Sequence, residues 1–291
     1  MSLSCLDIRG PGGVPSWGIG SQDQVHSTGE EMVFREDLFA DKVVFITGGG
    51  TGIGRALALD FAALGAHVVV AARRAEKLEE TVKLVEDQGG SGSFYTLDIR
   101  NADRIEEVVG EVFDEHDRLD VLINNAGANF MSPALAMSPN GWRTIIDINL
   151  NGTFLVSRAV GQQWMARNFA GRIINMSATN AYNGSPFLAH SGASKAGINS
   201  LTETLAVEWG GTGITVNAIL PGPVRTEGSD ERLWTDEDTV KKMASRIPLG
   251  RFARPEDISP LVQFLASDAG AFITGALIAV DGGDRLRTPN F

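Results

Sequence analysis

The stretch at residues 42–59, KVVFITGGGTGIGRALAL, constrains the fold of this chain more than any other part of the sequence. Strand-forming residues at 43–46 lead into a glycine-rich turn, after which Ile53, Leu57 and Phe61 recur at helical spacing. Glycines allow the backbone to approach a phosphate, and the N–H groups at a helix start bind anions. The stretch therefore predicts a strand–turn–helix unit that binds a dinucleotide. Its expected cofactor-binding residues are Gly48, Gly50, Thr51, Gly52, Ile53 and Gly54.

From Phe34 onward, apolar strands alternate with amphipathic helices. This alternation predicts an α/β fold, a single-domain Rossmann-type doubly wound parallel sheet of about seven strands with helices on both faces. The strands are expected at 43–47, 67–72, 93–97, 120–123, 171–176, 214–219 and 277–280, and the helices at 52–64, 75–88, 101–116, 139–168, 190–211 and 255–267. Residues 1–33 are rich in Gly, Pro and Ser without periodicity, which predicts a flexible N-terminal extension before a domain at 34–291.

Composition excludes several classes of protein. The net charge of −11 argues against a nucleic-acid partner, and the single cysteine, Cys5, excludes a disulfide framework. No apolar run approaches the roughly 18 residues needed to span a membrane, and the N-terminus does not resemble a signal peptide. No spacing of His, Cys and Asp indicates a metal site. We therefore expect a cytoplasmic protein with no membrane partner and no metal.

The residues after the second predicted strand favour NADP over NAD. A carboxylate at this place would bind the adenosine ribose hydroxyls and select NAD. The chain instead has Ala71 and Ala72, followed by Arg73 and Arg74. Two guanidinium groups suit the additional phosphate of NADP, which they can bind bidentately. The alternative is that both arginines are merely solvated at a helix start, although the helix dipole disfavours cations there.

Five motifs follow one another along the chain: TGGGTGIG at 47–54, LDI at 97–99, NNAG at 124–127, PGPVRT at 221–226 and DGG at 281–283. In this order they resemble the motifs of the short-chain dehydrogenase/reductase family. The resemblance implies hydride transfer with a nicotinamide cofactor, and usually a homotetramer built on the helices near 150–168 and 190–211. The further cofactor-binding residues that it implies are Asp98, Ile99, Asn125, Ala126, Gly127, Lys195, Pro221, Gly222, Val224 and Thr226.

The catalytic segment departs from that family's usual pattern. The family pairs a tyrosine with a lysine four residues later, whereas here Ser191 precedes Lys195 by four residues. Ala178 occupies the place of the serine that usually holds the substrate oxygen, and Ser177 lies one residue before it. A serine hydroxyl has a far higher pKa than the roughly 10 of tyrosine, so it is a poor proton donor to an alkoxide. Ordinary ketone reduction is therefore disfavoured.

A serine in place of the tyrosine, with the lysine kept, is similar to the 2,4-dienoyl-CoA and 2-enoyl-CoA reductases of the same family. The resemblance implies NADPH-dependent reduction of a carbon–carbon double bond conjugated to an acyl thioester, in fatty acid metabolism. Negative charge then develops on the thioester oxygen, which needs hydrogen-bond donors. The catalytic residues expected from this resemblance are Lys195, Ser191, Asn129, Asn149 and Tyr182.

The resemblance also implies a role for each of these residues. Asn129 matches a substrate-binding asparagine, and Asn149 matches an asparagine that kinks its helix and holds a water near the lysine. The dienoyl enzymes use a tyrosine where this chain has Asn180, so Tyr182, two residues on, is the expected replacement. We expect Asn129 and Tyr182 to contact the thioester oxygen and Ser191 to be secondary.

Two alternatives remain open from the sequence. One is an NADPH-dependent carbonyl reductase, acting on a 3-oxoacyl group or a ketone, in which Tyr182 or Ser177 replaces the usual donors. The other is a cofactor-binding protein without turnover. The retention of Lys195, Asn149 and Asn129 together counts against this second alternative. A charged, helical segment at about 225–250 is expected to form a lid over the substrate.

Overall fold

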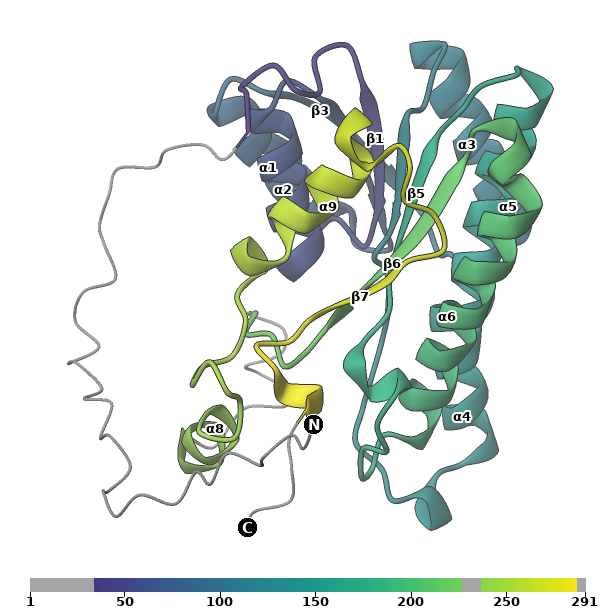
Figure 1. Cartoon of the computed structure of the whole chain (residues 1–291). Coiled ribbons are helices and arrows are strands. Elements are labelled where there is room, and N and C mark those ends of the chain that lie inside the picture. Colours follow the sequence, from purple (N-terminus) through teal and green to yellow (C-terminus); the bar gives the residue numbers. More distant parts are fainter. Residues whose placement is uncertain (1–33, 227–236, 287–291) are drawn as a thin grey trace, which may run out of the picture. The chain divides into compact units, whose positions relative to one another are not determined.

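The computed structural model describes residues 34–226 and 237–286 (Figure 1). Within them, seven parallel strands form one sheet in the order β3-β2-β1-β4-β5-β6-β7. The strands are β1 (Val43–Thr47), β2 (His67–Ala72), β3 (Ser91–Thr96), β4 (Val121–Asn124), β5 (Arg172–Met176), β6 (Thr215–Pro221) and β7 (Leu277–Val280). The prediction of a doubly wound parallel sheet is confirmed. The extension expected at residues 1–33 lies outside the described residues.

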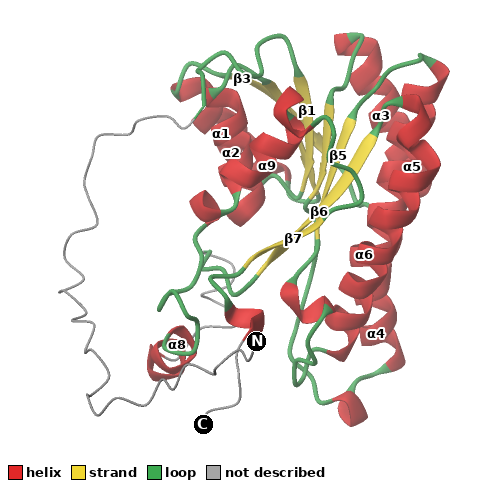
Figure 2. Ribbon diagram, viewed as in Figure 1, coloured by secondary structure: helices red, strands yellow, loops and turns green. Residues whose placement is uncertain are grey.

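Helices cover both faces of the sheet (Figure 2). The helices are α1 (Gly52–Ala63), α2 (Ala75–Asp87), α3 (Ala102–His116), α4 (Pro139–Ile146), α5 (Gly152–Ala166), α6 (Ala189–Trp209), α8 (Glu237–Ala244) and α9 (Ser259–Ala266). Helices α1, α2 and α9 pack on one face, and α3, α5 and α6 pack on the other. Of the lid predicted at 225–250, the structure describes residues 225–226 and 237–250, and residues 227–236 lie outside the described part.

Strand β1 divides the core into two apolar layers. Val44 and Ile46 pack with the side chains of α1, α2 and α9, whereas Val43 and Phe45 pack with those of α3, α5 and α6. Successive side chains of a strand point to opposite faces, so a strand covered on both faces must be apolar throughout. This explains why the sequence at 43–46 contains no polar residue, and it fixes β1 rigidly beneath the glycine-rich turn.

The long helix predicted at 139–168 is interrupted, which corrects the sequence expectation. Residues Asp147–Asn151 form η2, a π-helical turn between α4 and α5. The Thr153 hydroxyl donates a hydrogen bond of 2.7 Å to the backbone carbonyl of Asn149, which satisfies a carbonyl inside the widened turn. Single π-helical turns inside α-helices occur frequently at functional sites. The kink expected at Asn149 therefore takes the form of a π-helical turn.

The helix predicted at 255–267 is also divided. A 3₁₀ turn, η5 (Pro255–Asp257), precedes α9, which starts at Ser259. Pro260 lies in the first turn of α9, where its missing N–H is not needed. Deeper in one continuous helix, the same proline would remove a backbone hydrogen bond and clash with the preceding turn, so the helix restarts there.

Strand order determines where a ligand can bind. β1 pairs with β2 on one side and with β4 on the other, so the chain reverses its direction across the sheet after β3. At such a switch point the loops after neighbouring strands diverge, and a crevice opens beyond their carboxyl ends. The candidate site lies in this crevice.

Candidate active site

A cleft of about 590 Å³ opens at the carboxyl ends of β1, β2, β3 and β4. The predicted cofactor residues that line it are Gly48, Gly50, Thr51, Gly52, Ile53, Arg73, Arg74, Asp98, Ile99, Asn125, Ala126, Gly127 and Thr226. These residues come from separate loops that the parallel sheet brings to one edge. Ala71 and Ala72, expected at the end of the second strand, also line it. The lining residues that sequence reasoning did not assign to the cofactor site are Leu97, Lys77, Ala128 and Ile148. Lys77 could have been found, because it lies one helical turn after Arg73.

The glycine-rich turn is shaped for the close approach of a ligand. Gly48 has a φ of +69°, a conformation that side chains disfavour, and its N–H donates to the Ala71 carbonyl at 2.7 Å. A Cβ at Gly54 would clash with the Gly48 carbonyl and lie 2.5 Å from the Asn125 amide nitrogen. Gly54 is thus needed for packing beneath the turn, and it does not line the cleft.

Asn125 and Thr47 hold the loop after β1 against the loop after β4. Asn125 Nδ2 donates to the carbonyls of Thr47 and Gly48 at 3.0 and 3.2 Å. The Thr47 hydroxyl accepts the backbone N–H groups of Asn125 and Ala126 at 3.1 and 3.0 Å. These reciprocal bonds fix the floor of the cleft before any ligand enters, so little ordering remains to be done on binding.

The end of the cleft near β2 is cationic. Arg73 and Arg74 are exposed and line it together with Lys77, whose ammonium group also lies 2.8 Å from Glu80. A phosphate at this end would meet three positive side chains and no carboxylate from the end of β2. The open glycine turn and this cationic end together fit a dinucleotide that carries a ribose phosphate.

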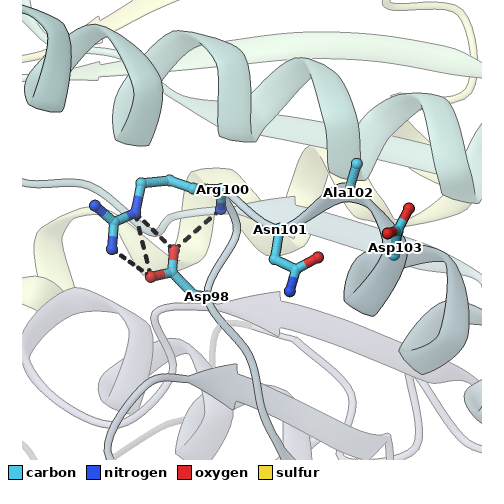
Figure 3. A pocket seen from close by; sticks show the side chains of 5 residues that line it. All are labelled: Asp98, Arg100, Asn101, Ala102 and Asp103. Atoms are coloured by element: carbon cyan, nitrogen blue, oxygen red, sulfur yellow. Dashed lines mark hydrogen bonds and ion pairs between the residues drawn. The ribbon is translucent and has the colours of Figure 1, made fainter.

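Asp98, expected on the adenine side, lies at the edge of a second hollow of about 540 Å³ lined by residues 98 and 100–103. Arg100 binds the Asp98 carboxylate with two kinds of donor: its Nε donates at 2.9 Å and its backbone N–H at 3.0 Å (Figure 3). The hydrogen bond from the Arg100 guanidinium holds the pKa of Asp98 below its usual value. Asp98 is therefore an anionic acceptor of fixed orientation at neutral pH.

Lys195 reaches the inner end of the cleft from α6. Its ammonium donates to the Met176 carbonyl at 2.6 Å. A methyl group added at Gly127, which lines the cleft, would lie 3.8 Å from Lys195 Nζ and 3.4 Å from Asn149 Oδ1. Lys195 and Asn149 thus flank the same backbone position, although neither lines the cleft directly. Burial lowers the pKa of Lys195 from 10.5 to about 8.

Asn149 links the cleft to α6. Its Oδ1 accepts the Ala128 N–H at 2.9 Å, and its Nδ2 donates to the Ala128 carbonyl at 3.2 Å and to Ser194 Oγ at 3.1 Å. The Ser194 hydroxyl in turn donates to the Ser191 carbonyl at 2.8 Å. The π-helical turn therefore positions an amide that joins the loop after β4 to the first turn of α6.

Ser191 is held from several sides. It is buried, its N–H donates to Nδ1 of the adjacent His190 at 2.8 Å, and its Oγ accepts Asn180 Nδ2 at 3.1 Å. His190 is also buried and meets the edge of the Phe130 ring, with 4.4 Å between ring centroids. Burial lowers the pKa of His190, so its imidazole is neutral at pH 7.

The three other candidate donors differ in their surroundings. Asn129 is half-buried, and its Oδ1 accepts the Phe130 N–H at 2.9 Å, which leaves its amide NH₂ for a ligand. Tyr182, just after the 3₁₀ turn η3 (Thr179–Ala181), has 53% of its surface exposed. The Ser177 hydroxyl donates to the Lys195 carbonyl at 3.1 Å, so it is directed at the backbone of α6.

Three predicted residues, at the end of β6 and just beyond it, lie outside the cleft. Gly222 donates its N–H to the Val280 carbonyl at 3.0 Å, and Val224 forms a bridge with Ala253. Pro221 is the last residue of β6. None of the three lines the cleft, whereas Thr226, a few residues further, does and lies against Gly52.

Residues 34–226 and 237–286 contain no group of three or more His, Cys, Asp or Glu side chains that could hold a metal ion. In that same part of the chain, no helix combines the length and apolar character needed to cross a bilayer.

Comparisons with known proteins agree with this geometry. The sequence family described as enoyl-(acyl carrier protein) reductase matches residues 48–284. A Bacillus subtilis protein named probable 2,4-dienoyl-CoA reductase is 44% identical over 246 residues, which cover 84% of this chain and 97% of that protein.

Solved structures share the fold over most of the chain. A short chain dehydrogenase from Bacillus anthracis is 42% identical with a TM-score of 0.79, covering 86% of this chain and 99% of that chain. A putative NAD(P)-dependent gluconate 5-dehydrogenase from Beutenbergia cavernae, solved with bound NADP, is 36% identical with a TM-score of 0.80. It covers 86% of this chain and 98% of that one.

Proposed function

Because this chain belongs to the short-chain dehydrogenase/reductase family, we propose that it is an NADPH-dependent oxidoreductase that reduces the carbon–carbon double bond of an enoyl- or 2,4-dienoyl-CoA. The observation that carries the proposal is the buried Ser191, four residues before Lys195, at the place where ketone reductases of the family have their acidic tyrosine. The relative from B. subtilis named as a probable 2,4-dienoyl-CoA reductase supports the same substrate class.

The cleft supports NADPH as the cofactor. When bound, the dinucleotide supplies the hydride. The turn at residues 48–54 and the first turn of α1 would hold its pyrophosphate, and Arg73, Arg74 and Lys77 would bind the ribose phosphate. Lys195 would hold the nicotinamide ribose. The relative from B. cavernae with bound NADP supports this choice.

Hydrogen-bond donors near Lys195 would stabilise the charge that develops on the substrate. The carbon chain gains a hydride and then a proton from solvent, and in between a negative charge rests on the thioester oxygen. The Asn129 amide and the Tyr182 hydroxyl are the proposed donors to that oxygen, and Ser191 assists them. Each donor of this kind is worth about 10²–10³ in kcat.

An apolar surface beside the site suits a fatty acyl chain. Phe130, Met131, Trp142 and Phe187 are each exposed by 38–58%. The Ser132 N–H joins the loop after β4 to the segment before α6 by a 2.9 Å bond to the Phe187 carbonyl. Exposed apolar side chains gathered on adjoining loops mark ligand-binding or interaction surfaces.

We also propose a homotetramer that uses the outer faces of α5 and α6. Phe154 and Met165 of α5 are 43% and 40% exposed, and Val207 of α6 is 84% exposed. Burying these apolar side chains against a second copy would stabilise the assembly. Sedimentation equilibrium at the mass of four chains would support this proposal, and a monomer mass would refute it.

The test is NADPH oxidation against 2-hexenoyl-CoA, 2,4-hexadienoyl-CoA and a panel of simple ketones. We expect turnover of at least one thioester, with a saturated carbon–carbon bond in the product, and little turnover of ketones. Asn129→Ala should lower kcat by about 10²–10³. Tyr182→Phe, assayed in parallel, shows whether the phenol donates. Ketone reduction without thioester reduction would instead support the carbonyl reductase alternative.

A further inference from the structure

The hydrogen bond between Asn180 and Ser191 leaves the serine hydroxyl free to donate. Asn180 Nδ2 lies 3.1 Å from Ser191 Oγ, which accepts this hydrogen bond with a lone pair. Among the residues that the structure describes, Ser191 Oγ has no acceptor for its own hydrogen. A hydroxyl that accepts one hydrogen bond becomes a stronger donor for the next. The amide thus both orients and polarises the serine O–H.

The backbone of Ser191 is fixed independently of its side chain. Its N–H is bonded to His190 Nδ1 and its carbonyl to the Ser194 hydroxyl, at 2.8 Å each. Ser194 is tied through Asn149 to the loop that lines the cleft. Since residues four apart lie on one face of a helix, Ser191 lies one turn before Lys195 and faces the same way. Rigid placement of a donor is a requirement for stabilising a transition state.

Asn180 also carries an unexplained buried acceptor. Its Oδ1 is buried and has no hydrogen-bond partner in the described structure. Burying a polar atom without a partner is unfavourable, so such an atom usually serves a ligand or a water. Asn180 follows β5 in the turn η3, which packs against α6 beside the inner end of the cleft.

Resting on the proposed function, we propose that Asn180 and Ser191 act as one unit, in which the Asn180 amide directs the Ser191 O–H at the thioester oxygen. Asn180 is then a positioning residue, and Ser191 is a principal donor. Ser191 thereby joins Asn129 and Tyr182 as a full donor, which replaces both the secondary role that the sequence suggests and the assisting role in the proposed function. This unit also explains how the chain can lack a tyrosine at position 180. The Asn180 amide orients the Ser191 hydroxyl, and this hydroxyl donates the hydrogen bond in place of a tyrosine.

The substitution Asn180→Asp tests the direction of this hydrogen bond. At neutral pH, the new carboxylate can only accept, so it would draw the Ser191 hydrogen toward itself and away from the substrate. We expect kcat on 2,4-hexadienoyl-CoA with saturating NADPH to fall by about 10²-fold or more. As the pH falls and the carboxyl group becomes protonated, it can again donate to Ser191 Oγ. The kcat of this variant should therefore recover toward acidic pH, relative to wild type.

Four further variants, one of them a double substitution, complete the experiment. Asn180→Ala should lose about tenfold in kcat at every pH, with little change in KM. Ser191→Ala should lose about 10² in kcat, and adding Asn180→Asp to it should cost little more. Asn183→Asp is the matched control, because Asn183 lies in the same loop and, within the described part of the chain, its side-chain amide bonds only to the backbone carbonyl of the exposed Arg285, at 3.3 Å. Its pH profile should match that of wild type.

The outcomes separate this proposal from the proposed function. Suppose that the wild-type protein reduces a thioester and that circular dichroism shows the Asn180→Asp variant to be folded. If the activity of this variant then does not recover at acidic pH, the role of Asn180 is overturned and the proposed function stands. Should that variant fail to fold, near wild-type kcat in Ser191→Ala or Asn180→Ala would overturn it. A wild-type protein that reduces neither thioester overturns the proposed function and, with it, this role.

Discussion

At the scale of single residues, Lys195 shows how burial adjusts a charge. The unfolded chain keeps this proton up to a pH near 10.5, whereas the folded protein releases it near pH 8. The unfolded state therefore binds more protons between these values, and the free energy of unfolding rises with pH across that window. Below pH 8 Lys195 is charged in the folded protein, and its burial in that form lowers the free energy of unfolding. Such a loss of stability is expected of a group whose role is to bind a ligand.

Activity should respond to the same titration. As the pH rises through about 8, Lys195 loses its charge, and the hold on the ribose hydroxyls that we propose for it would weaken. We expect kcat/KM for NADPH to fall with an apparent pKa near 8. Lys195→Arg, which stays charged, should lack this descending limb even if its overall activity is lower. An identical limb in both proteins would assign the titration to another group.

Arg73 provides the second prediction at this scale. Arg73→Ala should weaken NADPH binding by about 1.5–3 kcal/mol, the range for a hydrogen bond to a charged group. NADH lacks the ribose phosphate, so its affinity should not change. Calorimetric titration with both cofactors measures the difference, and Arg35→Ala, an exposed arginine paired with Asp37, is the control. Equal losses for NADPH and NADH would contradict the assignment.

At the scale of elements, the π-helical turn η2 serves the site rather than the stability of its helix. The side chain of Asn149, in this turn, is buried and hydrogen-bonded to both Ala128 and Ser194. A regular α-helix over 139–168 would satisfy its own backbone equally well. The local sequence therefore predicts one helix, and only the contacts with the loop after β4 explain the break.

Asn149→Ala should therefore destabilise the protein. The change leaves the partly buried Ala128 N–H without its acceptor, which costs about 1–3 kcal/mol in the free energy of unfolding. Asn151→Ala, in the same turn, removes only an exposed bond to Asp147 and should stay within about 0.5 kcal/mol of wild type. Urea denaturation of both variants measures the difference. Equal losses would show that the turn itself, not the Asn149 amide, carries the effect.

At the scale of the whole molecule, the sheet could be predicted because its signals are local. Each strand buried on both faces reads as an apolar run, and each helix has one apolar stripe. The glycine-rich turn and the cationic residues Arg73 and Arg74 also followed from local signals, since loops after neighbouring parallel strands must meet at one edge. The other predicted residues that line the cleft, Asp98, Ile99, Asn125, Ala126, Gly127 and Thr226, followed only from the resemblance to the short-chain dehydrogenase/reductase family.

Side-chain contacts between segments distant in the sequence could not be predicted from the sequence. Asn180 and Ser191 are 11 residues apart and meet only because η3 folds back onto α6. No periodicity or propensity encodes such a meeting, and the sequence therefore marked Asn180 only as a missing tyrosine. The bond of Ser177 to the α6 backbone was hidden for the same reason.

The π-helical turn has one more effect, on the angular phase of α5. Each residue of an α-helix advances the chain by about 100° around the axis. If residues 147–151 wound as a regular α-helix instead, with no residue removed, all of α5 would rotate by up to about that angle relative to α4. Val156, Val160 and Trp164, which now face the sheet, would leave the core, and Phe154 would turn away from the outer surface. The π-helical turn thus sets, at once, the placement of the Asn149 amide and the side chains that α5 presents to the sheet and to the outer surface.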